Sequence, residues 1–200
     1  MTSPQFCWLP ALLLGFAAPA QTSPPPLTGN LKKIRDEFTL TPGFRFTHVL
    51  ETRTAGKWAA VTYAGEAQNQ GGARFTIKGA GPADGTWLLA TPSYGKFVTY
   101  RRVGAGWKRQ ANPAAEHVRE VVLLLGLPSA GTVQRLAPQT VDGRATAHYR
   151  VTNAPNVADL WVDEAKGQLV RFDLAQPAAD YRYTTTYHQV GLTPVLPAVR

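Results

Sequence analysis

Residues 160–171, LWVDEAKGQLVR, have the pattern of two short strands joined by a tight turn. Trp161 is followed by valine, and aromatic and β-branched residues both favour strands. Asp163 can accept hydrogen bonds within a turn, and Gly167 can adopt the positive φ that many turns require. We therefore predict a β-hairpin centred on this stretch.

Short alternating segments of the same kind recur on both sides of this hairpin. In residues 44–51, for example, Phe44, Phe46 and His48 fall on one face of a predicted strand. The chain contains 18 Gly and 16 Pro, which favours many short elements over a few long helices. The predicted strands cover residues 44–51, 58–63, 73–78, 86–90, 96–101, 107–109, 132–137, 144–151, 157–163, 168–174 and 181–190.

Two segments repeat their apolar residues at helical spacing instead. Leu31, Ile34 and Phe38 predict a short helix over residues 30–39. A second helix is predicted over residues 113–125, where the apolar face consists of Val118, Val121, Val122 and Leu125. The predicted class is α+β: one large, curled antiparallel sheet of about eleven strands with helices packed on one face. Since strands and helices do not alternate, a dinucleotide-binding fold is excluded.

The first twenty residues have the pattern of a signal peptide. Residues 6–20 are apolar, are too short to span a bilayer comfortably, and end in Ala18-Pro19-Ala20. An N-terminal membrane anchor stays open as the alternative, because the first ten residues lack Lys and Arg. Cys7 precedes the apolar run, so lipidation is not expected. We expect export to the periplasm or cell envelope, a Pro-rich lead-in over residues 21–29, and one domain over residues 30–200.

Composition and motifs disfavour most catalytic classes. The single cysteine rules out a disulfide framework and a multi-cysteine metal site. The sequence has no nucleophile elbow, phosphate-binding loop or zinc-protease motif. His48, His117, His148 and His188 lack metal-ligand spacing, although His148 and His188 fall on strands that could be neighbours. We expect no enzyme activity, no cofactor and no metal.

Residues 160–171 resemble the hairpin (L/V)W(V/I)D…(T/K)G…(P/V)xR of the LolA-like superfamily. Residues 187–197, YHQVGLTPVLP, are similar to its final strand and exit segment, and the order of predicted elements also matches over residues 30–197. The superfamily includes the LolA and LolB lipoprotein carriers, the RseB/MucB sensors and the mycobacterial LppX/LprG lipid carriers. The resemblance implies an unclosed half-barrel whose concave face is covered by helices.

The same resemblance implies a monomeric, non-catalytic envelope protein that binds a lipid, an acyl chain or an acylated lipoprotein in its concave groove. The alternative is an envelope sensor of the RseB/MucB type, which binds a protein partner. LolA proteins also have an interior arginine that tethers the covering helix, and Arg45 and Arg74 are the candidates here. The expected groove and lid residues are Phe46, Trp58, Phe75, Trp87, Val118, Val121, Val122, Leu125, Tyr149 and Leu160.

The formal net charge is +8, from 21 Lys and Arg against 13 Asp and Glu. Basic residues cluster on the first predicted helix and on one hairpin, at Lys32, Lys33, Arg35, Arg101, Arg102, Lys108 and Arg109. Such clusters suit anionic lipid headgroups or an acidic partner, or they simply solubilise the outer face. Nucleic acid is not expected as a partner, because it conflicts with export.

Overall fold

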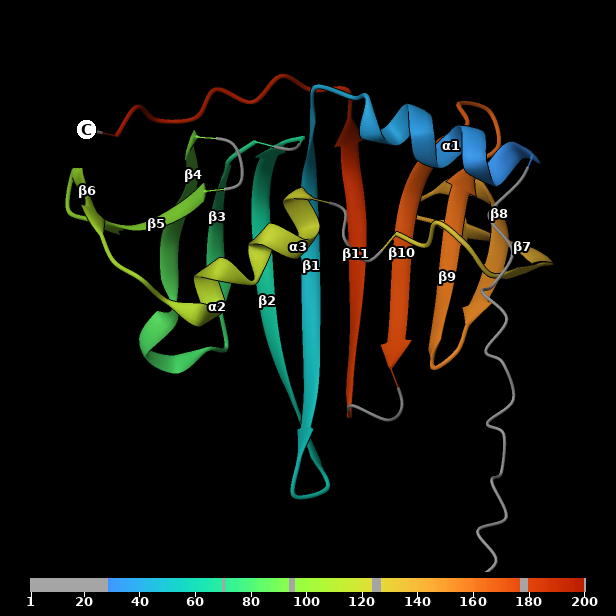
Figure 1. Cartoon of the computed structure of the whole chain (residues 1–200), viewed down its shortest axis with the longest axis horizontal. Coiled ribbons are helices and arrows are strands. Elements are labelled where there is room, and N and C mark those ends of the chain that lie inside the picture. Colours follow the sequence, from blue (N-terminus) through green and yellow to red (C-terminus); the bar gives the residue numbers. More distant parts are fainter. Residues whose placement is uncertain (1–28, 70, 94–95, 124–126, 177–179, 200) are drawn as a thin grey trace, which may run out of the picture.

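The computed structural model describes residues 29–69, 71–93, 96–123, 127–176 and 180–199, which form one antiparallel sheet with short helices over one face (Figure 1). The predicted signal peptide and most of the Pro-rich lead-in lie outside the described residues. The strands are β1 Gly43–Thr54, β2 Lys57–Gln68, β3 Ala73–Lys78, β4 Gly85–Ser93, β5 Lys96–Val103, β6 Gly106–Arg109, β7 Thr132–Val141, β8 Arg144–Asn153, β9 Asn156–Asp163, β10 Gln168–Gln176 and β11 Tyr181–Val190.

The eleven strands follow the order β6-β5-β4-β3-β2-β1-β11-β10-β9-β8-β7. Each half of the sheet is a meander in which consecutive strands pair, and the two halves join through β1 and β11. The edge strands β6 and β7 lie at opposite ends, so the sheet is curled but not closed. The predicted sheet of about eleven strands is therefore confirmed.

Strand β2 extends beyond the predicted residues 58–63. The prediction ended early because the segment around Gly65 lacks strand-favouring residues. The fold needs glycine here: a Cβ at Gly65 would lie 2.1 Å from the carbonyl oxygen of Arg74 and 2.6 Å from the Cα of Phe75. In register, Gly65 stands between Phe46 of β1 and Phe75 of β3. Its missing side chain leaves the inner face to these two rings.

The first helix, α1 Gly29–Thr39, agrees with the prediction and packs against β10. The prediction of one continuous helix over residues 113–125 is wrong, because the segment forms α2 Pro113–Glu116 and α3 Val118–Val122. The backbone tightens at the start of α3, where the N–H of Glu120 donates to the carbonyl oxygen of His117, 3.0 Å away, in a four-residue turn of the 3-10 type. Helix α2 contacts β4 and β5, and α3 contacts β2.

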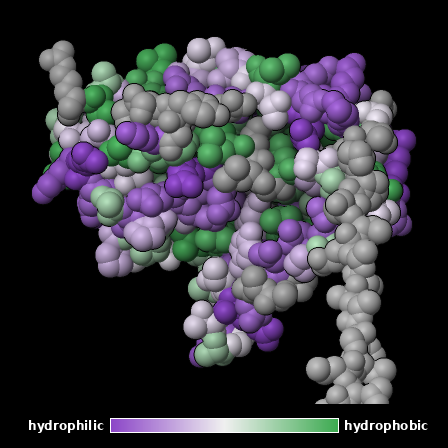
Figure 2. Space-filling model, viewed as in Figure 1, coloured by the Kyte–Doolittle hydropathy of each residue, from purple (hydrophilic) through white to green (hydrophobic). Residues whose placement is uncertain are grey.

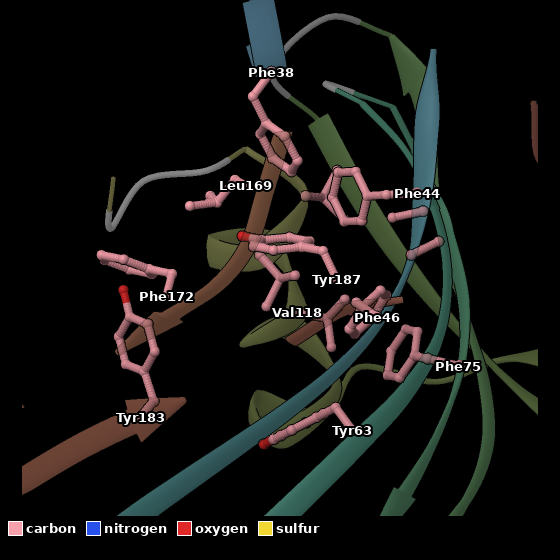
Figure 3. Close-up of a cluster of buried hydrophobic side chains, with 14 of the residues drawn as sticks. Phe38, Phe44, Phe46, Tyr63, Phe75, Val118, Leu169, Phe172, Tyr183 and Tyr187 are labelled. Atoms are coloured by element: carbon pink, nitrogen blue, oxygen red, sulfur yellow. The ribbon is translucent and has the colours of Figure 1, made fainter. Parts of the chain in front are cut away.

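The core lies between the helices and the inner, concave face of the sheet. Inward-facing aromatic residues from α1, β1 and β11 meet there: Phe38 packs edge-on against Tyr187 at 4.7 Å, and Tyr187 against Phe44 at 5.3 Å (Figure 3). The carboxyl-terminal segment then crosses the ends of the central strands, where Gln68 donates to the carbonyl oxygen of Pro194. Among the described residues, no helix is long and apolar enough to cross a membrane.

Candidate functional site

Most of the predicted groove residues come together, but as a packed core. Tyr149 is half-buried at the edge of this core, and Leu125 lies outside the described residues. Those that share one buried cluster are Phe46, Phe75, Trp87, Val118, Val121, Val122 and Leu160. Val118 and Val122 have no exposed surface at all, so α3 is closely packed on the sheet.

Trp58 does not belong to this group. It is 44% exposed on the convex face, with the guanidinium carbon of Arg182 4.5 Å from its ring centre. Successive strand residues face opposite sides of a sheet, and Tyr63 of the same strand is buried on the inner face. Trp58, an odd number of positions away, therefore points outward, and its assignment to the groove was wrong.

The space left beneath α3 is very small. A cavity of about 10 Å³ is lined by His48, Val121, Phe172 and Tyr183, among others. This volume accommodates about one water molecule. A second space of about 10 Å³ lies between α1 and β10, where Ile34, Leu127 and Leu169 meet.

A space large enough for a ligand opens beside α3, over the inner face of β8, β9, β10 and β11. This groove has a volume of about 360 Å³. Apolar side chains on β8, β9 and β10 contribute to its wall, and polar side chains lie among them. It is lined by Glu120, Leu127, Pro128, Ser129, Val151, Asn153, Asn156, Ala158, Leu174, Gln176, Tyr181 and Tyr183. Leu127 lines all three spaces, so the groove adjoins both small cavities.

Sequence reasoning missed the groove, although part of its signal was present. Val151 lies two positions from the predicted residue Tyr149 on β8, and Ala158 lies two positions from the predicted residue Leu160 on β9. Both Val151 and Ala158 are buried. Strand alternation therefore places them on the inner face. Leu127 and Pro128 follow α3 outside any predicted element, so no periodicity could assign them to the site.

The sheet and the covering helices are joined by a pair of histidines. His48 on β1 is buried, and its Nε2 lies 3.1 Å from Nε2 of His117 at the junction of α2 and α3. Its Nδ1 lies 2.8 Å from the hydroxyl of Thr185. Burial, with a smaller effect from His117, lowers the pKa of His48 to about 3. Burial also lowers the pKa of His117, so both rings are neutral near pH 7.

Arg45 and Arg74 do not lie in the interior. Both extend from the convex face toward the carboxylate of Glu66, with nitrogen–oxygen distances of 2.7 and 3.7 Å. The expectation that one of them tethers the covering helix was wrong, because the strand alternation that buries Phe44 and Phe46 turns Arg45 outward. The polar contact between sheet and helix is made by His48 instead.

The other two histidines do not form a site together. His148 and His188 stand on β8 and β11, which are separated by two strands. His148 is buried on the convex side and stacks on Trp161 at 4.3 Å, whereas His188 is near Asp142. Across the described parts of the chain, no three His, Cys, Asp or Glu residues lie close enough to hold a metal.

The sequence matches no protein-family model and no curated protein sequence. Solved structures do resemble the fold. The Mycobacterium tuberculosis lipoprotein LppX has a TM-score of 0.54 at 11% identity, with 84% of this chain and 95% of LppX covered. LprF from Mycobacterium bovis has a TM-score of 0.54 at 9% identity, with coverage of 84% and 94%. The Pseudomonas aeruginosa MucA/MucB complex is less similar, at a TM-score of 0.41 and 15% identity, with coverage of 84% and 59%.

The architecture defines a class of protein: an open, curled antiparallel sheet whose concave face is covered by short helices. LppX and LprF share this fold, which is the half-barrel that the resemblance in residues 160–171 and 187–197 implied. The predicted hairpin is present, with Gly167 at a φ of +64° and with Asp163 accepting hydrogen bonds from the N–H groups of Ala165 and Lys166. At these low identities the likeness concerns the fold.

Proposed function

We propose that the protein binds a lipid or acyl chain in the groove beside α3, as a non-catalytic carrier of the cell envelope. The observation that supports this proposal is the 360 Å³ groove on the concave face, whose wall includes Val151, Ala158 and Leu174. Burying an acyl chain contributes about 0.8 kcal/mol for each methylene removed from water. Polar side chains such as Asn153 and Asn156 suit the polar end of such a ligand.

The groove is a better location for the ligand than the space under α3. Val118 and Val122 are fully buried, and exposing each would cost about 1.5–3 kcal/mol. A ligand that enters beside α3 does not require this cost. The proposed path therefore runs along Leu127 and Leu174 and leaves the packed half of the sheet intact.

The test is binding of a fluorescent fatty acid to the purified protein and to two variants. Leu174→Asp places a charge on the groove wall, and we expect its affinity to fall at least about tenfold because burying an unpaired charge is unfavourable. Leu40→Asp is the control, because Leu40 is 84% exposed at the end of α1. Unfolding curves of both variants establish that the fold is retained.

Two results would contradict the proposal: a wild-type protein that binds no acyl probe, or equal affinities for Leu174→Asp and Leu40→Asp. Native mass spectrometry of protein purified from its own envelope provides a second readout. A co-purifying lipid supports the carrier, whereas a lipid-free protein that does not take up the probe favours the RseB/MucB-like sensor.

A further inference from the structure

Positive charge is segregated at one end of the sheet. Between Gly85 and Ala115 the chain contains no Asp or Glu, and this acid-free segment forms β4, β5, β6 and the start of α2. Its basic residues are Lys96, Arg101, Arg102, Lys108 and Arg109, which supply five of the chain's eight net positive charges. Figure 1 places β6 at the opposite end of the sheet from α1.

Basic residues elsewhere on the sheet are largely neutralised by neighbours. On the convex face, two-pronged pairs join Arg150 to Asp159, at 2.8 and 2.9 Å, and Arg182 to Glu51, at 2.8 and 3.1 Å. Within the described residues, none of the five basic residues of the β4–β6 segment forms an ion pair. The segment's positive charge is therefore available for a partner.

The nearest acidic residues along the chain do not compensate this charge. The carboxylate of Asp84 accepts hydrogen bonds from the backbone N–H groups of Gly79 and Ala80. Arg101 reaches only the carbonyl oxygen of Asp84, at 2.9 Å. Arg119 of α3 adds a sixth cation beside the segment, since its guanidinium lies 5.4 Å from the ring of Phe97 on β5.

The β5–β6 hairpin combines these charges with an apolar tip. Val103 is 57% exposed, and Trp107 is half-buried with the guanidinium of Arg102 5.5 Å from its ring. Exposed Gly104, Ala105 and Gly106 join the two residues. Figure 2 shows hydrophilic residues at the end of the molecule where β6 lies. Tryptophan and arginine are the residue types that favour the headgroup region of a bilayer.

We propose that the β5–β6 edge is a docking surface for anionic phospholipid headgroups. The unpaired charges complement a negative surface, and the Val103–Trp107 tip can enter the headgroup layer. An acidic polypeptide fits the observations less well, since β6 has only four residues on which an added strand could pair. Docking at this edge keeps the groove, on the other half of the sheet, accessible to its ligand, but it does not depend on the groove being occupied.

The experiment measures flotation of the purified protein with vesicles of phosphatidylglycerol and phosphatidylcholine, and with vesicles of phosphatidylcholine alone. We expect binding to the anionic vesicles that declines as salt is raised. Lys108→Glu combined with Arg109→Glu should weaken this binding at least about tenfold, because each basic residue near an anionic surface contributes about fivefold.

The matched control is Lys57→Glu combined with Lys166→Glu. Both lysines are exposed, neither has an ion pair within the described residues, and the change in net charge is the same. We expect the control to bind almost as the wild type does. The proposal is overturned if the two double variants lose affinity equally or if the wild type does not float with anionic vesicles. Polyglutamate is the probe for an acidic polypeptide, and a wild type that binds polyglutamate but not the anionic vesicles would also overturn it.

Discussion

His48 of β1 and His117 of the α2–α3 junction lie with their Nε2 atoms 3.1 Å apart, between the sheet and its covering helices. One ring must donate the shared hydrogen and the other must accept it, so the contact requires at least one neutral ring. The rings of Tyr63 and Tyr183 flank His48 at 5.6 and 4.9 Å, and Glu120 lies 3.6 Å from Nδ1 of His117. The packing of the helices therefore depends on the protonation of this pair.

The first prediction is a loss of stability on mild acidification. The pKa of His48 is about 3 in the folded protein and near 6.5 when unfolded, and that of His117 is also lowered. Between these values the unfolded chain binds more protons than the folded one, so the free energy of unfolding falls as pH decreases below about 6.5. The slope is at most about 1.4 kcal/mol per pH unit for each histidine. Urea unfolding at pH 7.5, 6.0 and 5.0 measures it.

Two variants assign this pH dependence. His117→Gln removes one titrating ring and should flatten the change in stability between pH 7.5 and 5.0. His188→Gln alters a half-exposed ring on the convex face and should keep most of the wild-type dependence. Identical slopes for the wild type and His117→Gln would contradict the assignment.

Strand alternation predicted the sheet well, because each strand buries every second residue and the signal is local. It also gave the buried position of Phe46 and His48. Trp58 was misassigned because the choice followed its aromatic character. It lies five positions from Tyr63 on the same strand, so strand alternation places its side chain on the opposite, outer face. The His48–His117 contact joins residues 69 positions apart and depends on how the helix breaks. Helical periodicity in residues 113–125 carries no signal for that break.

The second prediction concerns the close approach at Gly65. An added Cβ would lie 2.1 Å from the Arg74 carbonyl and 2.6 Å from the Phe75 Cα, and backbone cannot move as a side-chain end can. Gly65→Ala should therefore lower the free energy of unfolding by about 3 kcal/mol, the upper range for overpacked sites. Thermal and urea unfolding measure it. A variant as stable as the wild type would show that β2 and β3 separate easily here.

The third prediction concerns the turn at Gly167. Its φ is +64°, and an added Cβ would meet nothing within 4 Å, so any cost arises from the backbone conformation alone. Gly167→Val should destabilise by about 1 kcal/mol or more. Gly106→Val is the control, since a Cβ at Gly106 would meet only the carbonyl oxygen of Val103 at an ordinary contact distance of 3.9 Å and its φ is not positive. Equal unfolding midpoints for the two variants would contradict the argument.

The fourth prediction is cleavage after Ala20. The apolar run over residues 6–20 ends in a small-x-small pattern that signal peptidases recognise. Amino-terminal sequencing of protein isolated from the expressing cells should begin at Gln21. A sequence that still begins at Met1 in a cytoplasmic fraction would contradict export, and one that begins at Met1 in a membrane fraction would favour the anchor.

The last prediction separates the packed half of the concave face from the groove. Val122 is fully buried beneath α3, so Val122→Ala should lower the free energy of unfolding by about 1–3 kcal/mol through lost contacts and the cavity that remains. Because Val122 does not line the groove, the affinity of the Val122→Ala variant for a fluorescent fatty acid should be nearly the same as that of the wild type.

Leu127 should behave in the opposite way. It is half-buried and lines the groove, so Leu127→Ala should cost less stability than Val122→Ala and should weaken probe binding several-fold. Urea unfolding and probe titration, each performed on both variants, separate the two effects. If Val122→Ala impairs binding more than Leu127→Ala does, the ligand lies beneath α3, and this helix is then a lid that a ligand lifts rather than a fixed part of the core.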